Sequence, residues 1–142
     1  MRFVKTTSVS VRGVDTNVLV RFFTRDDPEQ FRLASELIGS AQPGELFLSP
    51  VVLVELNWTL LRAYRMPRAD VMNVLNGLVE SVEFTIGQRE LVMRAILMAD
   101  DANCDFSDAL IALLHESAGC RDTVTFDHRA LRLPQMRLVG AA

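Results

Sequence analysis

The stretch that decides the fold class reads LFLSPVVLVELNWTLLRAY and runs from residue 46 to residue 64. Its first three residues are apolar and form a run of the right length for one buried strand. Ser49 and Pro50 come next, and this pair is a typical helix start, because Ser caps a helix and Pro fits its first turn. The apolar residues that follow extend far enough for a helix over 51–64. A strand that leads directly into a helix is the repeating unit of α/β domains.

The alternation of short strands and helices continues on both sides of this stretch. Asp27, Pro28 and Gln30 mark another helix start, with Asp27 as the cap and Gln30 at the reciprocal capping position. We predict strands over 11–15, 46–48, 82–86, 123–126 and 137–139, and helices over 18–23, 28–39, 51–64, 67–80, 88–98 and 109–118. Strands separated by helices of this length pair in parallel. The predicted fold class is therefore α/β, a three-layer α/β/α sandwich with a mostly parallel central sheet.

Length and composition exclude several classes of protein. The chain has 142 residues, which is the size of one domain, and its apolar runs are far shorter than the ~20 residues that span a membrane. It has no glycine-rich phosphate-binding motif. With two cysteines and no secretory signal, we expect a reduced protein in the cytoplasm. The net charge of −3 provides no general attraction for nucleic acid, so such a ligand would need a local basic patch or a metal ion.

Four carboxylates stand where strands or buried helices would place them at one edge of the sheet. Asp15 ends one predicted strand and Asp127 directly follows another, and ligands of parallel sheets bind at the carboxyl ends of strands. Glu55 is the only charged residue between Phe47 and Leu61, so we expect it to be buried and to need a partner. Asp108 opens a strongly apolar helix.

Each carboxylate also has a purely structural interpretation. Asp15 would form a turn after its strand, Glu55 a buried ion pair, and Asp105 and Asp108 the cap and first turn of a helix. Four unrelated reasons for acids at the same end of one sheet are less economical than one shared reason. Oxygen ligands without His or Cys favour hard cations such as Mg²⁺ or Mn²⁺, and such ions support phosphodiester hydrolysis.

The segments that carry these acids resemble the PIN-domain nucleases, and among them the VapC-type toxins of bacterial toxin–antitoxin pairs. Four stretches carry the resemblance in this order along the chain: VDTNVLVR at 14–21, VVLVELNW at 51–58, DFSDALIA at 105–112 and TVTFD at 123–127. The resemblance implies metal binding and catalysis by Asp15, Glu55, Asp108 and Asp127, with Asp105 as a further acid at the same site. Thr16, Asn17 and Thr125 stand beside these acids and would orient them by hydrogen bonds.

The resemblance also implies an activity and partners. Proteins of this family are endoribonucleases that depend on Mg²⁺ or Mn²⁺, are commonly homodimers and are neutralised by a small VapB-like antitoxin. We expect the antitoxin to insert an amphipathic helix into an apolar groove around Leu56, Trp58, Leu60 and Leu61. Such proteins begin a few residues before the Asp-Thr-Asn motif, so we interpret residues 1–10 as an N-terminal extension and 11–142 as a single nuclease domain.

Two alternatives stay open at this point. The same fold and acids would serve a metal-dependent DNase or a structure-specific nuclease. A non-catalytic binding domain would use the acids only as caps and ion pairs. Cleavage assays on single-stranded RNA and on DNA distinguish the ribonuclease from the first alternative. A metal titration distinguishes it from the second, because a non-catalytic domain should show no change of melting temperature with metal.

Overall fold

Strands and helices alternate along the whole described part of the chain. A computed structural model describes residues 10–141. The strands are β1 (Arg12–Gly13), β2 (Leu46–Leu48), β3 (Phe84–Ile86), β4 (Thr123–Thr125) and β5 (Met136–Leu138). The helices are α1 (Thr16–Thr24), α2 (Pro28–Gly39), α3 (Pro50–Trp58), the π-helical turn η1 (Thr59–Ala63), α4 (Arg68–Glu80), α5 (Arg89–Ala102), α6 (Phe106–Ser117) and the 3₁₀ helix η2 (His128–Arg132). The predicted extension lies, except for Ser10, outside the described residues.

The strands pair in parallel, and the predicted α/β class with parallel strands is confirmed. β2 lies between β1 and β3, while β4 pairs with β5 in a second sheet. The prediction of one central sheet differs from this arrangement, because no ladder among residues 10–141 joins β1 to β4. β1 has only two residues, since α1 begins at Thr16, and so short a strand offers a neighbour few hydrogen bonds.

The helix starts lie where the capping residues predicted them. The Asp27 side chain accepts a hydrogen bond from the Gln30 N–H, and the Ser49 hydroxyl accepts one from the Val52 N–H. Both capped helices also carry Pro in the first turn. The predicted helix over 51–64 differs in its second half, where η1 replaces regular α-helix.

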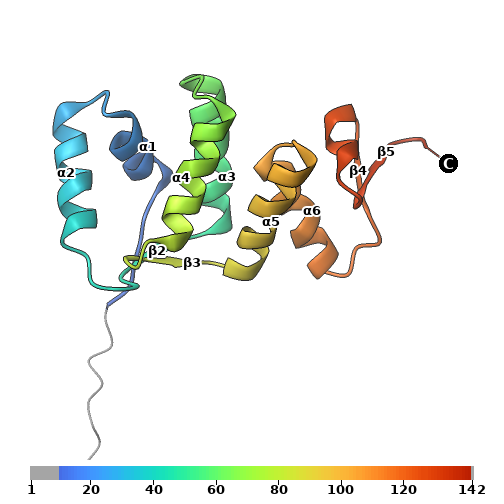
Figure 1. Ribbon diagram of the computed structural model, residues 1–142. Coiled ribbons are helices and arrows are strands. Elements are labelled where there is room, and N and C mark those ends of the chain that lie inside the picture. Colours follow the sequence, from blue (N-terminus) through green and yellow to red (C-terminus); the bar gives the residue numbers. More distant parts are fainter. Residues whose placement is uncertain (1–9, 142) are drawn as a thin grey trace, which may run out of the picture.

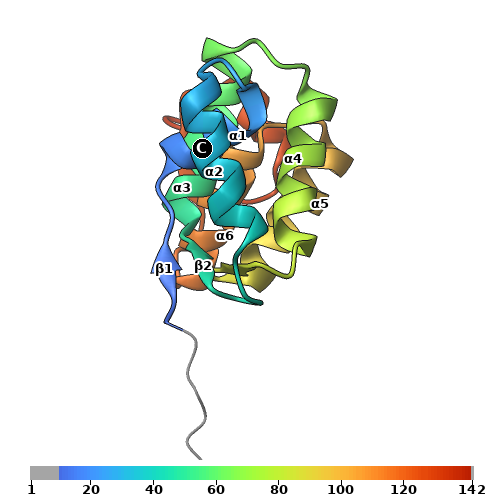
Figure 2. The same cartoon turned by 90° about the vertical axis from the view of Figure 1, so that its left-hand side faces the viewer.

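The helices stand in a row, with β2 and β3 beneath them and β4 and β5 at the right-hand end of the row, at the height of the helices (Figure 1). Viewed at right angles, β1 and β2 run along one edge beneath α1, α2 and α3 (Figure 2). The core fills the space between these elements with fully buried side chains from β2, α3 and α6, among them Leu48, Leu53, Leu56, Leu110 and Leu113. α6 packs against both α3 and β4, so this helix links the three-stranded part of the molecule to the β4–β5 sheet.

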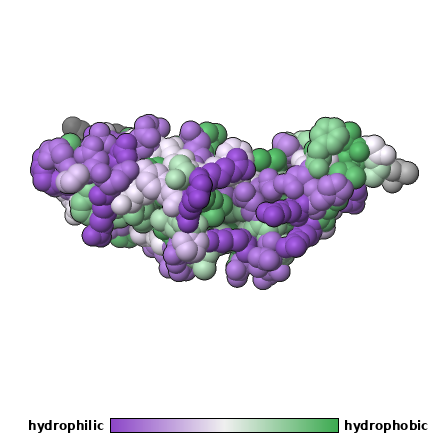
Figure 3. All heavy atoms as spheres, turned by 90° about the horizontal axis from the view of Figure 1, so that it is seen from above, coloured by the Kyte–Doolittle hydropathy of each residue, from purple (hydrophilic) through white to green (hydrophobic). Residues whose placement is uncertain are grey.

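From above, the molecule is longer than it is broad, and hydrophilic side chains cover most of this face (Figure 3). Apolar side chains gather at the end that carries β4 and β5. Val124 and Phe126 are 64% and 79% exposed there. None of the helices among residues 10–141 is long and apolar enough to cross a membrane.

Candidate active site

The predicted site residues fall into two groups, and the first group joins β1 to α3. Asp15 is exposed and directly precedes α1. The hydroxyl of Thr16, the next residue, donates a hydrogen bond of 3.1 Å to Oε1 of Glu55 on α3. This contact brings the chain segment of Asp15 to the acid of α3.

Glu55 is exposed, so the prediction that it is buried is wrong. The reason is the periodicity of α3. Leu53 and Leu56 are fully buried, whereas Val51, one turn before Glu55 on the same face, is 66% exposed. The outer face of α3 therefore carries apolar residues as well as Glu55, and an apolar sequence did not mean burial on every side. An exposed carboxylate is free to take a ligand from solvent without losing a buried partner.

The second group lines a pocket of about 380 Å³ between α3, η1, the start of α6 and the segment after β4. Asp105 and Asp108 reach it from the N-terminus of α6, and Asp127 reaches it from the end of β4. Asn57, Arg62 and Arg129 are among the polar residues of the same wall. The structure thus brings together three of the acids that are separated by as many as 22 positions in the sequence.

The electrostatics of this pocket concentrate on Asp108. Burial, as the largest cause, and the negative charges of Asp105 and Asp127 together raise its pKa from 3.8 to about 6, while the positive charge of Arg62 acts in the opposite direction. A cation beside Asp108 would relieve both the repulsion and the loss of hydration, so this pocket favours a cation. The donor set consists of carboxylate oxygens, which suits Mg²⁺ or Mn²⁺. On this observation the residues of the pocket fit the ion that the family implies.

Asn57 holds Asp105 in place, a role that the sequence analysis missed. The buried amide of Asn57 donates to Oδ1 of Asp105 at 2.7 Å and to Oγ of Ser107 at 2.9 Å. The same Oδ1 accepts the Ser107 N–H at 2.7 Å, so Asp105 caps α6. The sequence does contain a signal for this role. Asn57 is a single amide side chain in an otherwise apolar helix, two residues after Glu55, and a buried amide needs hydrogen-bond partners.

The neighbouring polar residues differ in what they contact. Thr16 bonds Glu55, as described, and the Thr125 hydroxyl accepts a hydrogen bond of 3.0 Å from the Asp127 N–H. Asn17 instead lines a separate groove between α1 and α2. Two of the three residues that were predicted to orient the acids therefore lie in contact with them or with their backbone.

Asp15 and Glu55 are not among the residues that line the pocket of Asp105, Asp108 and Asp127. Within residues 10–141, no three side chains of Asp, Glu, His or Cys lie close enough together to hold one ion. The joint site of Asp15, Glu55, Asp108 and Asp127 thus stays a prediction.

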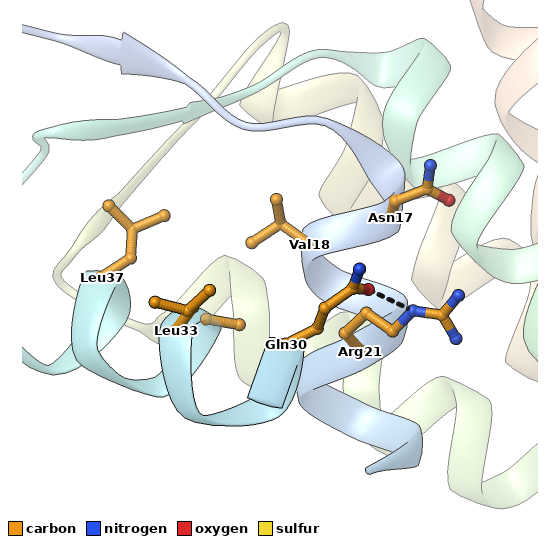
Figure 4. A pocket seen from close by; sticks show the side chains of 7 residues that line it. Asn17, Val18, Arg21, Gln30, Leu33 and Leu37 are labelled. Carbon is orange, nitrogen blue, oxygen red and sulfur yellow. Dashed lines mark hydrogen bonds between the residues drawn. The ribbon is translucent and has the colours of Figure 1, made fainter. Parts of the chain in front are cut away.

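The groove between α1 and α2 is a second hollow, of about 330 Å³. Val18, Leu33 and Leu37 line it with apolar groups, and Arg21 donates a hydrogen bond to Gln30 at its rim (Figure 4). The predicted groove is wrong for Leu56 and Leu60, because both side chains are fully buried in the core. Its other two members, Trp58 and Leu61, are partly exposed.

The comparison with known families agrees with this fold. The model of the PIN domain matches residues 14–135, a range that contains all the predicted site residues. The chain belongs to the PIN-domain family. It is also similar to a VapC ribonuclease of Aquifex aeolicus (strain VF5), at 24% identity over 121 residues, which cover 84% of this chain and 90% of that protein. The family inferred from the four sequence stretches is thereby confirmed.

Proposed function

We propose that this protein is a divalent-metal-dependent endoribonuclease that hydrolyses RNA phosphodiester bonds and acts as the toxin of a toxin–antitoxin pair. The observation that carries the proposal is the pocket of Asp105, Asp108 and Asp127, in which mutual repulsion and burial raise the pKa of Asp108 to about 6. Membership of the PIN-domain family and similarity to a VapC ribonuclease support it.

In this proposal Asp15, Glu55, Asp108 and Asp127 hold Mg²⁺ or Mn²⁺, and Asp105 lies beside them. A bound divalent ion activates water for attack on phosphorus and stabilises charge on the leaving oxygen. The chain contributes the geometry. Asn57 fixes the Asp105 cap, and the cap fixes the first turn of α6, from which Asp108 extends into the pocket.

Cleavage of total cellular RNA by the purified protein tests this proposal directly. We expect cutting with Mn²⁺ or Mg²⁺ that is abolished by EDTA and by Asp15→Asn. Asp100→Asn, an exposed acid of α5, is the matched control and should cut at the wild-type rate. Equal cleavage by wild type and Asp15→Asn would contradict the assignment of Asp15.

The two alternatives give different results in the same assays. A DNase would cut single-stranded DNA in preference to RNA of the same sequence. A non-catalytic domain would cut neither, and Mn²⁺ would leave its melting temperature unchanged. A ligand that binds only the folded state raises stability by about 2.7 kcal/mol at a hundred times its Kd, so binding is measurable without catalysis.

We propose that the antitoxin lays an amphipathic helix into the groove between α1 and α2. The groove is apolar, and Leu33 is 51% exposed in it, which suits the apolar face of a helix. Leu33→Glu should weaken complex formation at least tenfold while RNA cleavage by the free toxin is retained. Leu97→Glu, an equally apolar and exposed position on α5, is the control. Unchanged binding by Leu33→Glu would place the antitoxin elsewhere.

We also propose that the protein is a homodimer in the cytoplasm. The exposed Val124 and Phe126 at the end that carries β4 and β5 support self-association, because contiguous apolar surface is typical of an interface. Sedimentation velocity of the wild type and of Val124→Glu tests the dimer. A wild type that sediments as a monomer at all concentrations would contradict it.

A further inference from the structure

A π-helical turn shapes the wall of the acidic pocket. η1 continues α3 with a hydrogen bond from the Tyr64 N–H to the Thr59 carbonyl, five residues earlier. Turns of this kind are rare and occur frequently at functional sites, because the extra residue changes the direction of the side chains that follow. Leu60 in this turn is fully buried, whereas Arg62 is exposed. The turn thus combines an anchor in the core with an arginine at the pocket.

The far end of the turn is fixed from outside the helix. The Tyr64 hydroxyl donates a hydrogen bond of 2.7 Å to Asp26, which also accepts one from Arg21 at 2.9 Å. Asp26 belongs to the loop between α1 and α2. With Leu60 in the core and Tyr64 bound to this loop, both sides of Arg62 are held.

Arg62 lies on an aromatic surface next to the acids. Its guanidinium carbon is 5.2 Å from the centre of the Trp58 ring, and its charge lowers the pKa of Asp108. Stacking uses the flat face of a guanidinium and leaves the N–H groups at its edge available. Those N–H groups are the donors that match phosphate oxygens.

Arg129 reaches the same pocket from another element. It belongs to η2, and its backbone N–H bonds Oδ1 of Asp127 at 2.9 Å, which fixes its place beside that acid. The ion pairs found among residues 10–141 involve other arginines, and neither Arg62 nor Arg129 takes part in one. Two exposed guanidinium groups therefore border the acidic pocket without a carboxylate partner at ion-pair distance.

We propose that Arg62 and Arg129 form a phosphate clamp that holds the RNA backbone across the acidic pocket, an inference that rests on the proposed function. With a net charge of −3, RNA binding needs a local basic group or a metal ion, and the two arginines are such a local basic group. The acids and their cation take the phosphate to be cut, and the two arginines take phosphates of the strand on either side. Arg62 is the positioned member, because Trp58 supports its face.

Binding of a fluorescein-labelled single-stranded RNA, measured by anisotropy in EDTA over a series of KCl concentrations, tests the clamp without catalysis. We expect Arg62→Gln and Arg129→Gln each to weaken binding about five- to tenfold. Each should also reduce the slope of log Kd against log salt by about 0.7, the value for one lost phosphate contact on a single strand. Arg62→Lys should retain the slope and lose a smaller part of the affinity.

Arg121→Gln is the matched control, because it removes the same charge from a residue whose side chain is 95% exposed. Arg121 follows the C-terminal end of α6, about 18 Å from the end that carries Asp108. We expect it to change binding less than twofold. Melting curves of all variants check that the exposed substitutions leave the fold intact.

The outcomes separate the clamp from the proposed function. If wild type cuts RNA and Arg62→Gln binds no more weakly than Arg121→Gln, the clamp is wrong and the nuclease proposal stands. A loss of affinity with an unchanged salt slope also overturns it, since the contact would then not be to phosphate. If wild type neither binds nor cuts RNA with any metal, both proposals are wrong.

Discussion

Replacing Asp108 by Asn should stabilise the metal-free protein at pH 8 and have little effect at pH 4.5. Burial, helped by Asp105 and Asp127, raises the pKa of Asp108 from 3.8 to about 6. The folded state therefore binds the proton more tightly than the unfolded state does. The stability that comes with the proton is fully present below pH 4 and is lost as the pH rises through about 6. At pH 8 the Asp108 carboxylate of the wild type is ionised and lowers the stability of the folded state. The neutral amide of Asn carries no charge and therefore removes this loss of stability.

The size of the effect follows from the pKa shift. A shift of about 2 units corresponds to about 3 kcal/mol at 1.36 kcal/mol per unit, for a fully buried group. Asp108 is only half-buried, so solvent screening reduces the expected gain to about 1–2 kcal/mol. For a domain of this length that gain corresponds to about 3–6 °C in melting temperature.

Urea denaturation in EDTA, followed by circular dichroism at both pH values, measures this gain. Asp101→Asn is the control, since it removes an exposed acid of α5, and it should shift stability equally at the two pH values. An Asp108→Asn gain of the same size at pH 4.5 and pH 8 would refute the reasoning, and so would a loss of stability at pH 8.

Further predictions concern the residues that support the site. Asn57→Ala removes the buried donor to Asp105 and should lower the free energy of unfolding by about 2 kcal/mol. Asn76→Ala, on the exposed face of α4, is the control and should leave it unchanged. Thermal melts of both variants measure the difference. Tyr64→Phe removes the hydrogen bond that is the largest cause of the low pKa of Asp26, about 2, so that pKa should rise toward 3.8 in a carboxyl NMR titration. A pKa that stays near 2 would assign the effect to the other partners of Asp26.

The helix starts could be predicted from the sequence because each depends on residues next to one another. Asp27 caps the N–H of Gln30, Ser49 that of Val52, and Asp105 that of Ser107. A cap is one hydrogen bond between residues two or three positions apart, so the residues that form it can be recognised from the local sequence alone.

The parts that differ from the prediction depend on contacts between distant residues. In the π-helical turn η1 the backbone hydrogen bond joins residues five positions apart instead of the four of an α-helix. No spacing of residues in the sequence predicts this change. The pairing of β1 with β2 joins Arg12 to Leu46, and that of β4 with β5 joins Thr123 to Met136, so neither is a local feature of the sequence. Arg62 was not proposed from the sequence for the same reason, because only the fold brings it beside Asp108.

The capping interpretation and the metal interpretation of the acids describe different oxygens. In Asp105 and in Asp127, Oδ1 accepts a hydrogen bond from a backbone N–H, which leaves Oδ2 of each for another partner. Asp15 accepts no capping bond from α1, and no side-chain hydrogen bond among residues 10–141 involves Asp108. Helix capping therefore explains why acids stand after β4 and before α6, but it gives no reason for a half-buried acid at position 108, whose charge destabilises the fold. The proposed cation would supply that reason, because it would turn the cost of the Asp108 charge into binding energy.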